Sequence, residues 1–390
     1  TATDVNLNVH STSEAPKYVG AHFGLLFSAV RAVLQPEPLV TYVLSIRYIK
    51  LHMMYFCGVE GGSSSTEVVI LSSTGELLST IVGPHVNQWF LGYPEAVKRI
   101  LNLIEQALKK ANLPTDTKLA AVGLALSGVD SEDNVRDCEM NFMASSQTVT
   151  DHVFACNDTF GTLYAATDKA GIVVIAGTGS TCRYIREDLS YERIGGYGYM
   201  LGDEASGFWI THRCMKLYVD DDEGLVKCPY DTEPVRKALF KHFSLRSNID
   251  LLEPLYHFKK NEFSSLCKTF GEMGRNGDEL CKHVFREAGY FLGAHVMAVL
   301  PKTDKAILED PEGVSVICRG AVFKSWDLLK PGFEDRVMPD LKAGKPIRRL
   351  RLFMLNSSVA AGAALLAAHV CLKIQVPRHP DLSLMAEFNG

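Results

Sequence analysis

The pattern of hydrophobic and polar positions becomes regular near residue 55 and predicts strands joined by short turns. Tyr55 to Val59 is a β-prone run that ends in the turn Glu60-Gly61-Gly62-Ser63-Ser64, and residues 67–82 hold two further predicted strands. Apolar side chains recur at helical spacing between residues 94 and 112. The unbroken apolar run from Leu119 to Leu126 is typical of a strand in the middle of a sheet. This order of elements predicts an α/β unit.

The second half of the chain repeats this order. Residues 172–176 form an apolar strand, Gly177-Thr178-Gly179-Ser180 forms a glycine turn, and residues 182–185 continue as the next strand. Two copies of the same order predict duplicated α/β lobes that face each other. Later elements are predicted as a helix at 204–219 with Asp203 as its N-cap, a helix at 281–300 and a final strand at Val314 to Cys318.

Residues 1–53 do not follow the pattern. Their two apolar stretches are interrupted by Arg31, by two prolines and by Arg47, so neither reaches the roughly 20 residues that span a membrane. The segment also lacks the basic start of a signal peptide. We predict an extension of unknown role at 1–53, a first lobe at 54–167 and a second lobe at 168–390, whose last helix is expected to pack back on the first lobe.

Composition narrows the class of protein. The 390 residues exceed what one hydrophobic core usually holds, and 47% hydrophobic with 22% charged residues is typical of a globular protein. A formal net charge of −5 offers no basic surface, so neither nucleic acid nor a membrane is an expected partner. The ten cysteines contain no C-x-x-C pair, which predicts reduced thiols and a cytoplasmic protein.

The two glycine turns are candidates for phosphate binding. Gly61, Gly62 and Ser64 in the first turn and Thr178 in the second offer N–H groups and hydroxyls to a polyphosphate. Alone, each turn is more typical of a β-hairpin, whereas two facing turns can hold phosphates from both lobes. The sequence contains no Walker motif. Glu60, next to the first turn, is either a magnesium ligand or a solvated carboxylate.

Two aspartates are candidates for acid–base chemistry. Asp158 stands between a predicted strand and a predicted helix, where a carboxylate can accept the proton of a sugar hydroxyl or cap the helix. Asp203 has the same two roles open to it and follows the glycine-rich turn Gly195-Gly196-Tyr197-Gly198. Aromatic rings beside polar acceptors are typical of a pyranose site, and Asn87-Gln88-Trp89 offers this mixture too.

From Tyr55 to Cys371 the sequence resembles the N-acetylglucosamine kinases of the BadF/BadG-type ATPase family. The resemblance implies an α/β protein of the actin-like ATPase (ribonuclease H-like) fold, with two lobes and a central cleft. The segments that carry it, in the family's order and spacing, are Gly58-Val59-Glu60-Gly61-Gly62, Val86-Asn87-Gln88-Trp89, Leu126-Ser127-Gly128, Asn157-Asp158, Gly177-Thr178-Gly179-Ser180, Gly195-Gly196-Tyr197-Gly198, Gly202-Asp203-Glu204 and Lys324-Ser325-Trp326.

The resemblance also implies an activity, which is transfer of the ATP γ-phosphate to the C6 hydroxyl of N-acetylglucosamine, with Mg2+ as the accompanying ion. Asp158 would be the general base, and a homodimer is expected. The implied sugar contacts are Asn87, Asp158, Ser180, Thr181, Gly196 and Asp203, and the implied nucleotide contacts are Gly61, Gly62, Ser64, Thr178, Ser264 and Gly320. Thr181 replaces an Asn of the family and Tyr197 a Trp, so both positions bear on sugar specificity.

Other interpretations remain open from the sequence. An actin-fold kinase acting on another hexose would use the same loops, although the zinc-binding Cys/His cluster of repressor-related glucokinases is absent from the sequence. A dehydratase-activating ATPase would need paired cysteines near a phosphate loop, and the sequence has none there. A sugar-sensing scaffold without catalysis would have no need of a base at Asp158. Turnover measured with several sugars distinguishes these interpretations.

Overall fold

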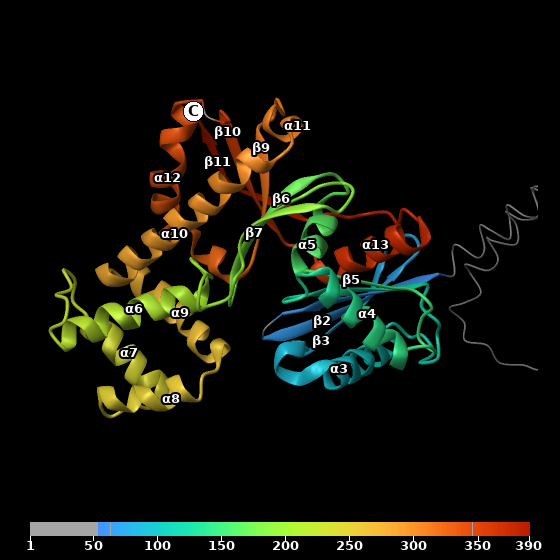
Figure 1. The fold of residues 1–390 in the computed structure, drawn as a ribbon, viewed down its shortest axis with the longest axis horizontal. Coiled ribbons are helices and arrows are strands. Elements are labelled where there is room, and N and C mark those ends of the chain that lie inside the picture. The colour runs from blue at the N-terminus through green and yellow to red at the C-terminus, as the bar shows by residue number, and fades with distance from the viewer. Residues whose placement is uncertain (1–53, 63, 345) are drawn as a thin grey trace, which may run out of the picture. The chain divides into compact units, whose positions relative to one another are not determined.

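Two β-sheets organise the chain, which the computed structural model describes for residues 54–390 except 63 and 345 (Figure 1). The extension predicted at 1–53 and Ser63 of the first glycine turn lie outside the described residues. The first sheet has the strand order β3-β2-β1-β4-β5 and the second has the order β11-β10-β9-β6-β7-β8. Apart from β11, the second order repeats the first with the same connectivity, so the predicted duplication of α/β lobes is confirmed.

The first sheet is mixed. β1 pairs antiparallel with β2 and parallel with β4, and β4 is parallel to β5. Every residue of β4 is buried, because α5 and α13 pack on one face of this strand and residues of α3 and α4 pack on the other, as its unbroken apolar run predicts. The elements of this lobe are β1 Tyr55–Gly61, β2 Ser65–Ser72, β3 Leu77–Pro84, α3 Gln88–Lys110, β4 Ala121–Leu126, α4 Glu132–Ser145, β5 Val153–Cys156 and α5 Asp158–Ala166.

The second sheet repeats this pairing. β6 is antiparallel to β7 and parallel to β9, and long helices join β8 to β9. Its elements are β6 Gly171–Ala176, β7 Ser180–Ile185, β8 Tyr191–Gly195, α6 Gly207–Asp222, α7 Glu233–Phe243, α8 Leu252–Tyr256, α9 Lys260–Arg275, α10 Glu279–Val299, α11 Lys305–Leu308, β9 Val314–Arg319, α12 Trp326–Lys342, β10 Arg349–Leu355, α13 Val359–Leu372 and β11 Leu382–Asn389.

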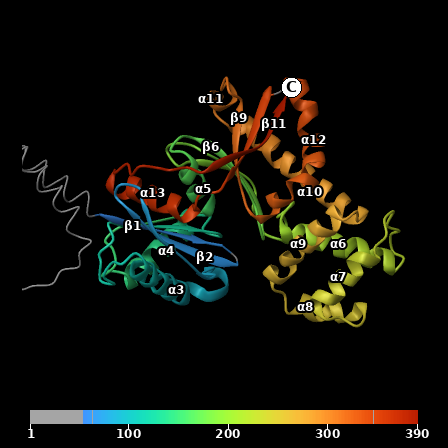
Figure 2. The same ribbon diagram turned by 180° about the vertical axis from the view of Figure 1, so that it is seen from behind.

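Helix α13 follows a strand of the second sheet but packs on β1 and β4 of the first, beside α5 (Figure 1 and Figure 2). Glycines in these two strands permit the close approach. A Cβ atom at Gly58 would stand 1.7 Å from the carbonyl oxygen of Ala360, and one at Gly123 would stand 2.0 Å from that of Ala363. The backbone of α13 therefore lies directly on the first sheet.

The predicted start of one helix and the predicted last strand were wrong. Helix α6 begins at Gly207 with Ser206 as its N-cap, because Asp203 and Ala205 adopt positive φ angles of 62° and 67° that no helix accommodates. The strand predicted as the last, here β9, is followed by β10 and β11. In β10 arginines alternate with apolar residues, and Arg349 pairs with Glu387 of β11 at 3.1 Å, so its charges obscured the strand pattern.

The cysteine side chains and the apolar character of the helices can be compared with what the sequence predicts. All ten cysteines are free, nine of them buried and Cys371 partly buried. Among the described residues, no helix combines the length and the apolar character that crossing a membrane requires.

Candidate active site

The two glycine turns predicted to bind phosphate meet at their hydroxyl groups. Ser64 Oγ and Thr178 Oγ1 are 3.2 Å apart, within hydrogen-bond distance, although 114 residues separate them. Ser64 lies in the β1–β2 turn, where the Gly62 N–H donates to the oxygen of Ser65 at 3.0 Å. Thr178 lies in the corresponding β6–β7 turn of the second lobe. Equivalent turns of the two lobes thus bring backbone N–H groups and hydroxyls to one place.

Gly320 and Ser264, both predicted nucleotide contacts, border the second turn. Gly320 has φ of 120°, and a Cβ atom there would stand 2.2 Å from the oxygen of Ala176 and 3.0 Å from the nitrogen of Gly177, so only glycine fits. The Gly207 N–H donates to the oxygen of Gly177 at 2.8 Å, and a Cβ at Gly207 would lie 3.2 Å from the oxygen of Ser264. Segments distant in sequence therefore surround Gly177.

Asp203, predicted to contact the sugar, holds the second turn in place. It is 3% exposed, and its Oδ1 accepts a hydrogen bond from the Ser180 N–H at 3.0 Å. Its Oδ2 is 2.5 Å from Nζ of Lys260, at the start of α9. A Cβ on Gly179 would stand 3.1 Å from the same Nζ. Sequence reasoning missed this lysine, because nothing near it in the chain marks it as part of the turn.

Polar groups without partners lie beside the predicted sugar contacts. Thr181 pairs with Gly195 across β7 and β8, and a Cβ at Gly196 would stand 2.8 Å from Thr181 Oγ1. This hydroxyl is buried and has no hydrogen-bond partner among the described residues. The same holds for both amide atoms of Gln88, next to Asn87. Buried polar groups are normally satisfied, so these atoms are available to a ligand or to water.

Asp158 is the first residue of α5, and its neighbour Asn157 caps that helix. Asn157 Oδ1 accepts hydrogen bonds from the Thr159 N–H at 3.1 Å and from the Thr159 hydroxyl at 2.7 Å. The alternative role of Asp158 as the N-cap is therefore wrong. Burial raises the pKa of Asp158 to about 6, the charge of Arg183 opposes the rise, and that of Asp130 adds to it. A carboxylate that ionises just below neutral pH suits a general base.

Glu60 lies at the end of β1 in the same electrostatic environment. Burial raises the pKa of Glu60 to about 7; the guanidinium of Arg319, 4.0 Å away, lowers it, and the charges of Glu67 and Asp158 raise it further. Within residues 54–390, as far as they are described, no three His, Cys, Asp or Glu side chains gather as a metal site. Magnesium commonly takes one or two carboxylates together with substrate phosphates, so Glu60 fits as a ligand only alongside a nucleotide.

Hydrogen bonds connect Asn87 to the neighbourhood of Asp158 through the loop 127–130. Asn87 caps α3 by accepting a hydrogen bond from the Trp89 N–H at 2.9 Å, and Trp89 Nε1 donates to the oxygen of Gly128 at 3.2 Å. Gly128 belongs to the loop 127–130 after β4, whose Asp130 accepts a hydrogen bond from Asn157 Nδ2 at 3.1 Å. In the part of the chain that the structure describes, no direct hydrogen bond joins Asn87 to Asp158.

Arg183 is the second residue that sequence reasoning missed. It lies on β7, is 2% exposed and forms an ion pair with Asp130 of the first lobe. Its guanidinium carbon is 4.7 Å from the ring centre of Tyr191, whose hydroxyl donates to the oxygen of Asp130 at 2.9 Å. The available signal was a single charge inside the predicted strand at 182–185, because a buried charge needs a partner.

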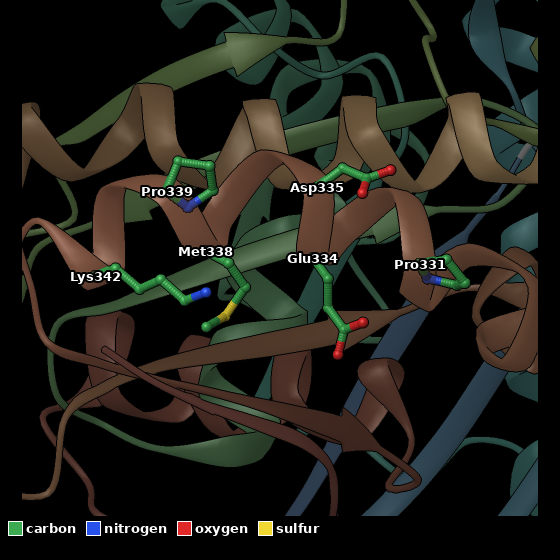
Figure 3. A pocket seen from close by; sticks show the side chains of 6 residues that line it. All are labelled: Pro331, Glu334, Asp335, Met338, Pro339 and Lys342. Carbon is green, nitrogen blue, oxygen red and sulfur yellow. The ribbon is translucent and has the colours of Figure 1, made fainter.

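Two hollows on the surface lie outside this site. One of about 460 Å³ runs along α12 and is lined by Pro331, Glu334, Asp335, Met338, Pro339 and Lys342 (Figure 3). A second of about 480 Å³ adjoins it along α10 and shares Asp335. Neither includes a residue of the glycine turns or a candidate acid, so these hollows do not mark the site.

The strand orders and the paired turns define an α/β protein of the actin-like ATPase fold with two lobes, each built on a mixed sheet. The chain belongs to the BadF/BadG/BcrA/BcrD ATPase family, whose model matches residues 57–367.

Relatives and solved structures extend over most of the chain. A protein of Clostridium acetobutylicum named N-acetylmuramic acid/N-acetylglucosamine kinase is 26% identical over 327 residues, covering 82% of this chain and 100% of the relative. An N-acetyl-D-glucosamine kinase of Dictyostelium discoideum is 25% identical over 331 residues, covering 80% of this chain and 97% of the relative.

Among solved structures, a protein of Chromobacterium violaceum proposed to be an N-acetylglucosamine kinase matches with a TM-score of 0.64 and 25% identity, covering 81% of this chain and 99% of that one. A ROK family glucokinase of Streptomyces griseus, solved with glucose and AMPPNP, matches with a TM-score of 0.54 and 16% identity over 81% of this chain and 99% of that one. The second likeness shows the fold alone.

Proposed function

We propose that this protein transfers the γ-phosphate of ATP to the C6 hydroxyl of N-acetyl-D-glucosamine, giving N-acetylglucosamine 6-phosphate. The observation that carries the proposal is the approach of Ser64 and Thr178, which brings two glycine turns from separate lobes to one place. Membership of an ATPase family and relatives named as N-acetylglucosamine kinases support it.

The turns provide the nucleotide site. Gly61 and Gly62 line the first turn, and the backbone N–H of Thr178 and the two hydroxyls face the phosphates; preorganised donors of this kind stabilise the charge of a phosphoryl group in transfer. Gly320 and Ser264, the other two proposed nucleotide contacts, flank the second turn. Glu60 would hold magnesium together with the phosphates, and the ion would supply charge neutralisation.

Asp158 accepts the proton of the attacking sugar hydroxyl. Its pKa of about 6 leaves it ionised at neutral pH and still basic enough to take a proton as the oxygen attacks. The sugar contacts proposed around it are Asn87, Ser180, Thr181, Gly196 and Asp203. In this set the hydroxyl of Thr181 is buried without a hydrogen-bond partner, so it is available to bind the sugar. Lobe closure over the sugar would exclude water, which otherwise competes for the phosphoryl group.

A panel of acceptors tests the proposal. ADP release is measured with N-acetylglucosamine, N-acetylmuramic acid, N-acetylmannosamine, glucose and no sugar, and the position of the phosphate is read by phosphorus–proton NMR correlation. We expect the highest kcat/KM with N-acetylglucosamine and a 6-phosphate product. Preference for another hexose would indicate a different sugar kinase. Equal ADP release with and without sugar would indicate an ATPase. Sugar binding without turnover would indicate a sugar sensor.

A further inference from the structure

An ion pair between the lobes, formed by the buried Arg183 and the partly exposed Asp130, is connected to the helix that carries Asp158. Arg183 extends from β7 of the second sheet and pairs with Asp130, in the loop after β4 of the first. Asp130 Oδ1 also accepts from Asn157 Nδ2 at 3.1 Å, and Asn157 caps α5. One chain of hydrogen bonds therefore runs from the second lobe to the residue before Asp158.

Aromatic rings fix the direction of the Arg183 guanidinium. Its central carbon is 4.7 Å from the ring centre of Tyr191 on β8 and 6.0 Å from that of Phe160 on α5. The two rings contact each other edge to face at 5.6 Å. The pair contributes little net stability, since removal of the Arg183 charge from water offsets much of its attraction to Asp130. Such a well-held cation beside a candidate base suggests a role in the reaction.

We propose that Arg183 is a positioning residue of the reaction, which from the second lobe fixes the first turn of α5, and with it Asp158, through Asp130 and Asn157. The inference rests on the proposed function, in which Asp158 is the base. In this proposal the position of Asp158 depends on the contact that Arg183 makes between the two lobes. Neither Arg183 nor Asp130 touches the reacting atoms in this proposal.

The charges around Asp158 make the proposal testable through the pKa of Asp158. Arg183 from β7 lowers the pKa of Asp158, and Asp130 from the loop after β4 raises it. Glu60 from β1, beside Arg319 of β9, and the thiol of Cys156 from β5 also lie in its electrostatic range. Removal of the Arg183 charge should therefore raise the pKa of Asp158, and removal of the Asp130 charge should lower it. Residues that support the fold at a distance from Asp158 would not produce opposite shifts.

The experiment measures kcat, KM and kcat/KM against pH for the full chain and for Arg183→Gln and Asp130→Asn. For Arg183→Gln we expect kcat to fall about 10- to 100-fold with little change in KM, and the acid limb of the profile to move to higher pH. For Asp130→Asn, whose side chain is 31% exposed and whose amide can still accept from Asn157, the limb should move to lower pH. Asp130→Asn keeps the test decisive if Arg183→Gln fails to fold.

A matched control and a conservative variant complete the design. Arg186→Gln removes an arginine directly after β7, which pairs with Glu192 and Asp304, and it should leave the profile unchanged. Arg183→Lys should keep the position of the acid limb but not the full kcat, because an ammonium lacks the planar guanidinium fork. Shifts in the same direction, or a uniform loss at every pH, would overturn the positioning role. Absence of sugar turnover in the unaltered protein would instead overturn the proposed function, and this role with it.

Discussion

Lys260 Nζ lies 2.5 Å from Asp203 Oδ2, and both side chains are largely buried against the second glycine turn. The other oxygen of Asp203 receives the Ser180 N–H. The aspartate therefore links α9 to the backbone of the turn proposed to bind phosphate. Its positive φ of 62° shows that the chain accepts local strain to place it there.

Substitution of Asp203 should separate the two bonds that it makes. Asp203→Asn keeps an acceptor for the Ser180 N–H, whereas Asp203→Ala loses it, so we expect KM for ATP to rise more in the alanine variant. Removing one partner of a buried pair should lower the free energy of unfolding by about 3 kcal/mol in Asp203→Ala. Kinetics and urea unfolding check both results.

The control for Asp203 is Asp335→Ala, which breaks an exposed ion pair with Arg286. It should change stability by less than about 1 kcal/mol. Equal KM values for the two Asp203 variants would show that the bond to Ser180 does not shape the nucleotide site.

Alanine at Gly62 or Gly177 tests whether the turns bind phosphate or only connect strands. A Cβ atom at Gly177 meets nothing within 4 Å, the nearest atom to one at Gly62 is 3.4 Å away, and neither residue has a positive φ. Folding should therefore be preserved to within about 1 kcal/mol. If the backbone approaches phosphate oxygens, the added methyl groups should raise KM for ATP by about tenfold or more.

Isothermal titration with a non-hydrolysable ATP analogue and thermal unfolding provide the two measurements for these glycine variants. Sugar affinity serves as the internal control, because neither Gly62 nor Gly177 is an expected sugar contact. Unchanged nucleotide affinity in both variants would favour simple hairpin turns and remove the main support for the proposed function.

Asp158→Asn should abolish turnover while it stabilises the fold. We expect kcat to fall by about a thousandfold, with sugar affinity largely kept, because the amide cannot accept the proton. In the folded protein the pKa of Asp158 is raised from 3.8 to about 6, so its charged form is disfavoured by folding. The stability penalty grows as pH rises through this window and is complete above it. At neutral pH the variant should gain on the order of 3 kcal/mol.

Unfolding of Asp158→Asn is best compared with the unaltered protein at two pH values. Near pH 4 the carboxyl is largely protonated when folded, so the difference in stability should shrink. A variant with a retained rate would show that the base is misassigned, and one with reduced stability at neutral pH would contradict the unfavourable burial of its charge.

The unaltered enzyme should lose activity as pH falls through about 6, since the base must be ionised to accept a proton. The profile of kcat/KM should drop about tenfold for each pH unit below this point. Initial rates at sub-saturating sugar give this profile, and circular dichroism at each pH separates titration of the base from unfolding. A flat profile between pH 5 and 8 would be incompatible with the raised pKa of Asp158 as the controlling group.

Local patterns along the chain predicted much of the fold. Apolar runs and glycine turns located β1, β4, β6 and β9, and the repeated order predicted that Ser64 and Thr178 would face each other. These features depend on neighbouring residues alone. The charged strand β10 and the shifted start of α6 escaped prediction, because Arg349 and Asp203 are satisfied by partners far away in the sequence.

The candidate site divides in the same way. Residues of the turns and the strand ends, such as Thr178 and Asp158, can be identified from neighbouring glycines and from their position after a predicted strand. Arg183, Asp130 and Lys260 do not, since their partners lie 53 and 57 positions away and periodicity carries no information about such pairs. Three-dimensional placement was needed to show that they support the predicted residues.

Alanine at Gly123 tests the packing of α13 on the first sheet. A Cβ atom there would stand 2.0 Å from the oxygen of Ala363, a backbone atom that cannot move without shifting the helix. We expect a loss of about 3 kcal/mol in the free energy of unfolding. At Gly171, by contrast, the nearest atom is a terminal methyl of Leu163 at 2.7 Å, which can rotate away, so Gly171→Ala should cost clearly less. Urea unfolding of both variants gives the comparison, and equal costs would mean that α13 does not lie as closely on the sheet as its backbone positions require.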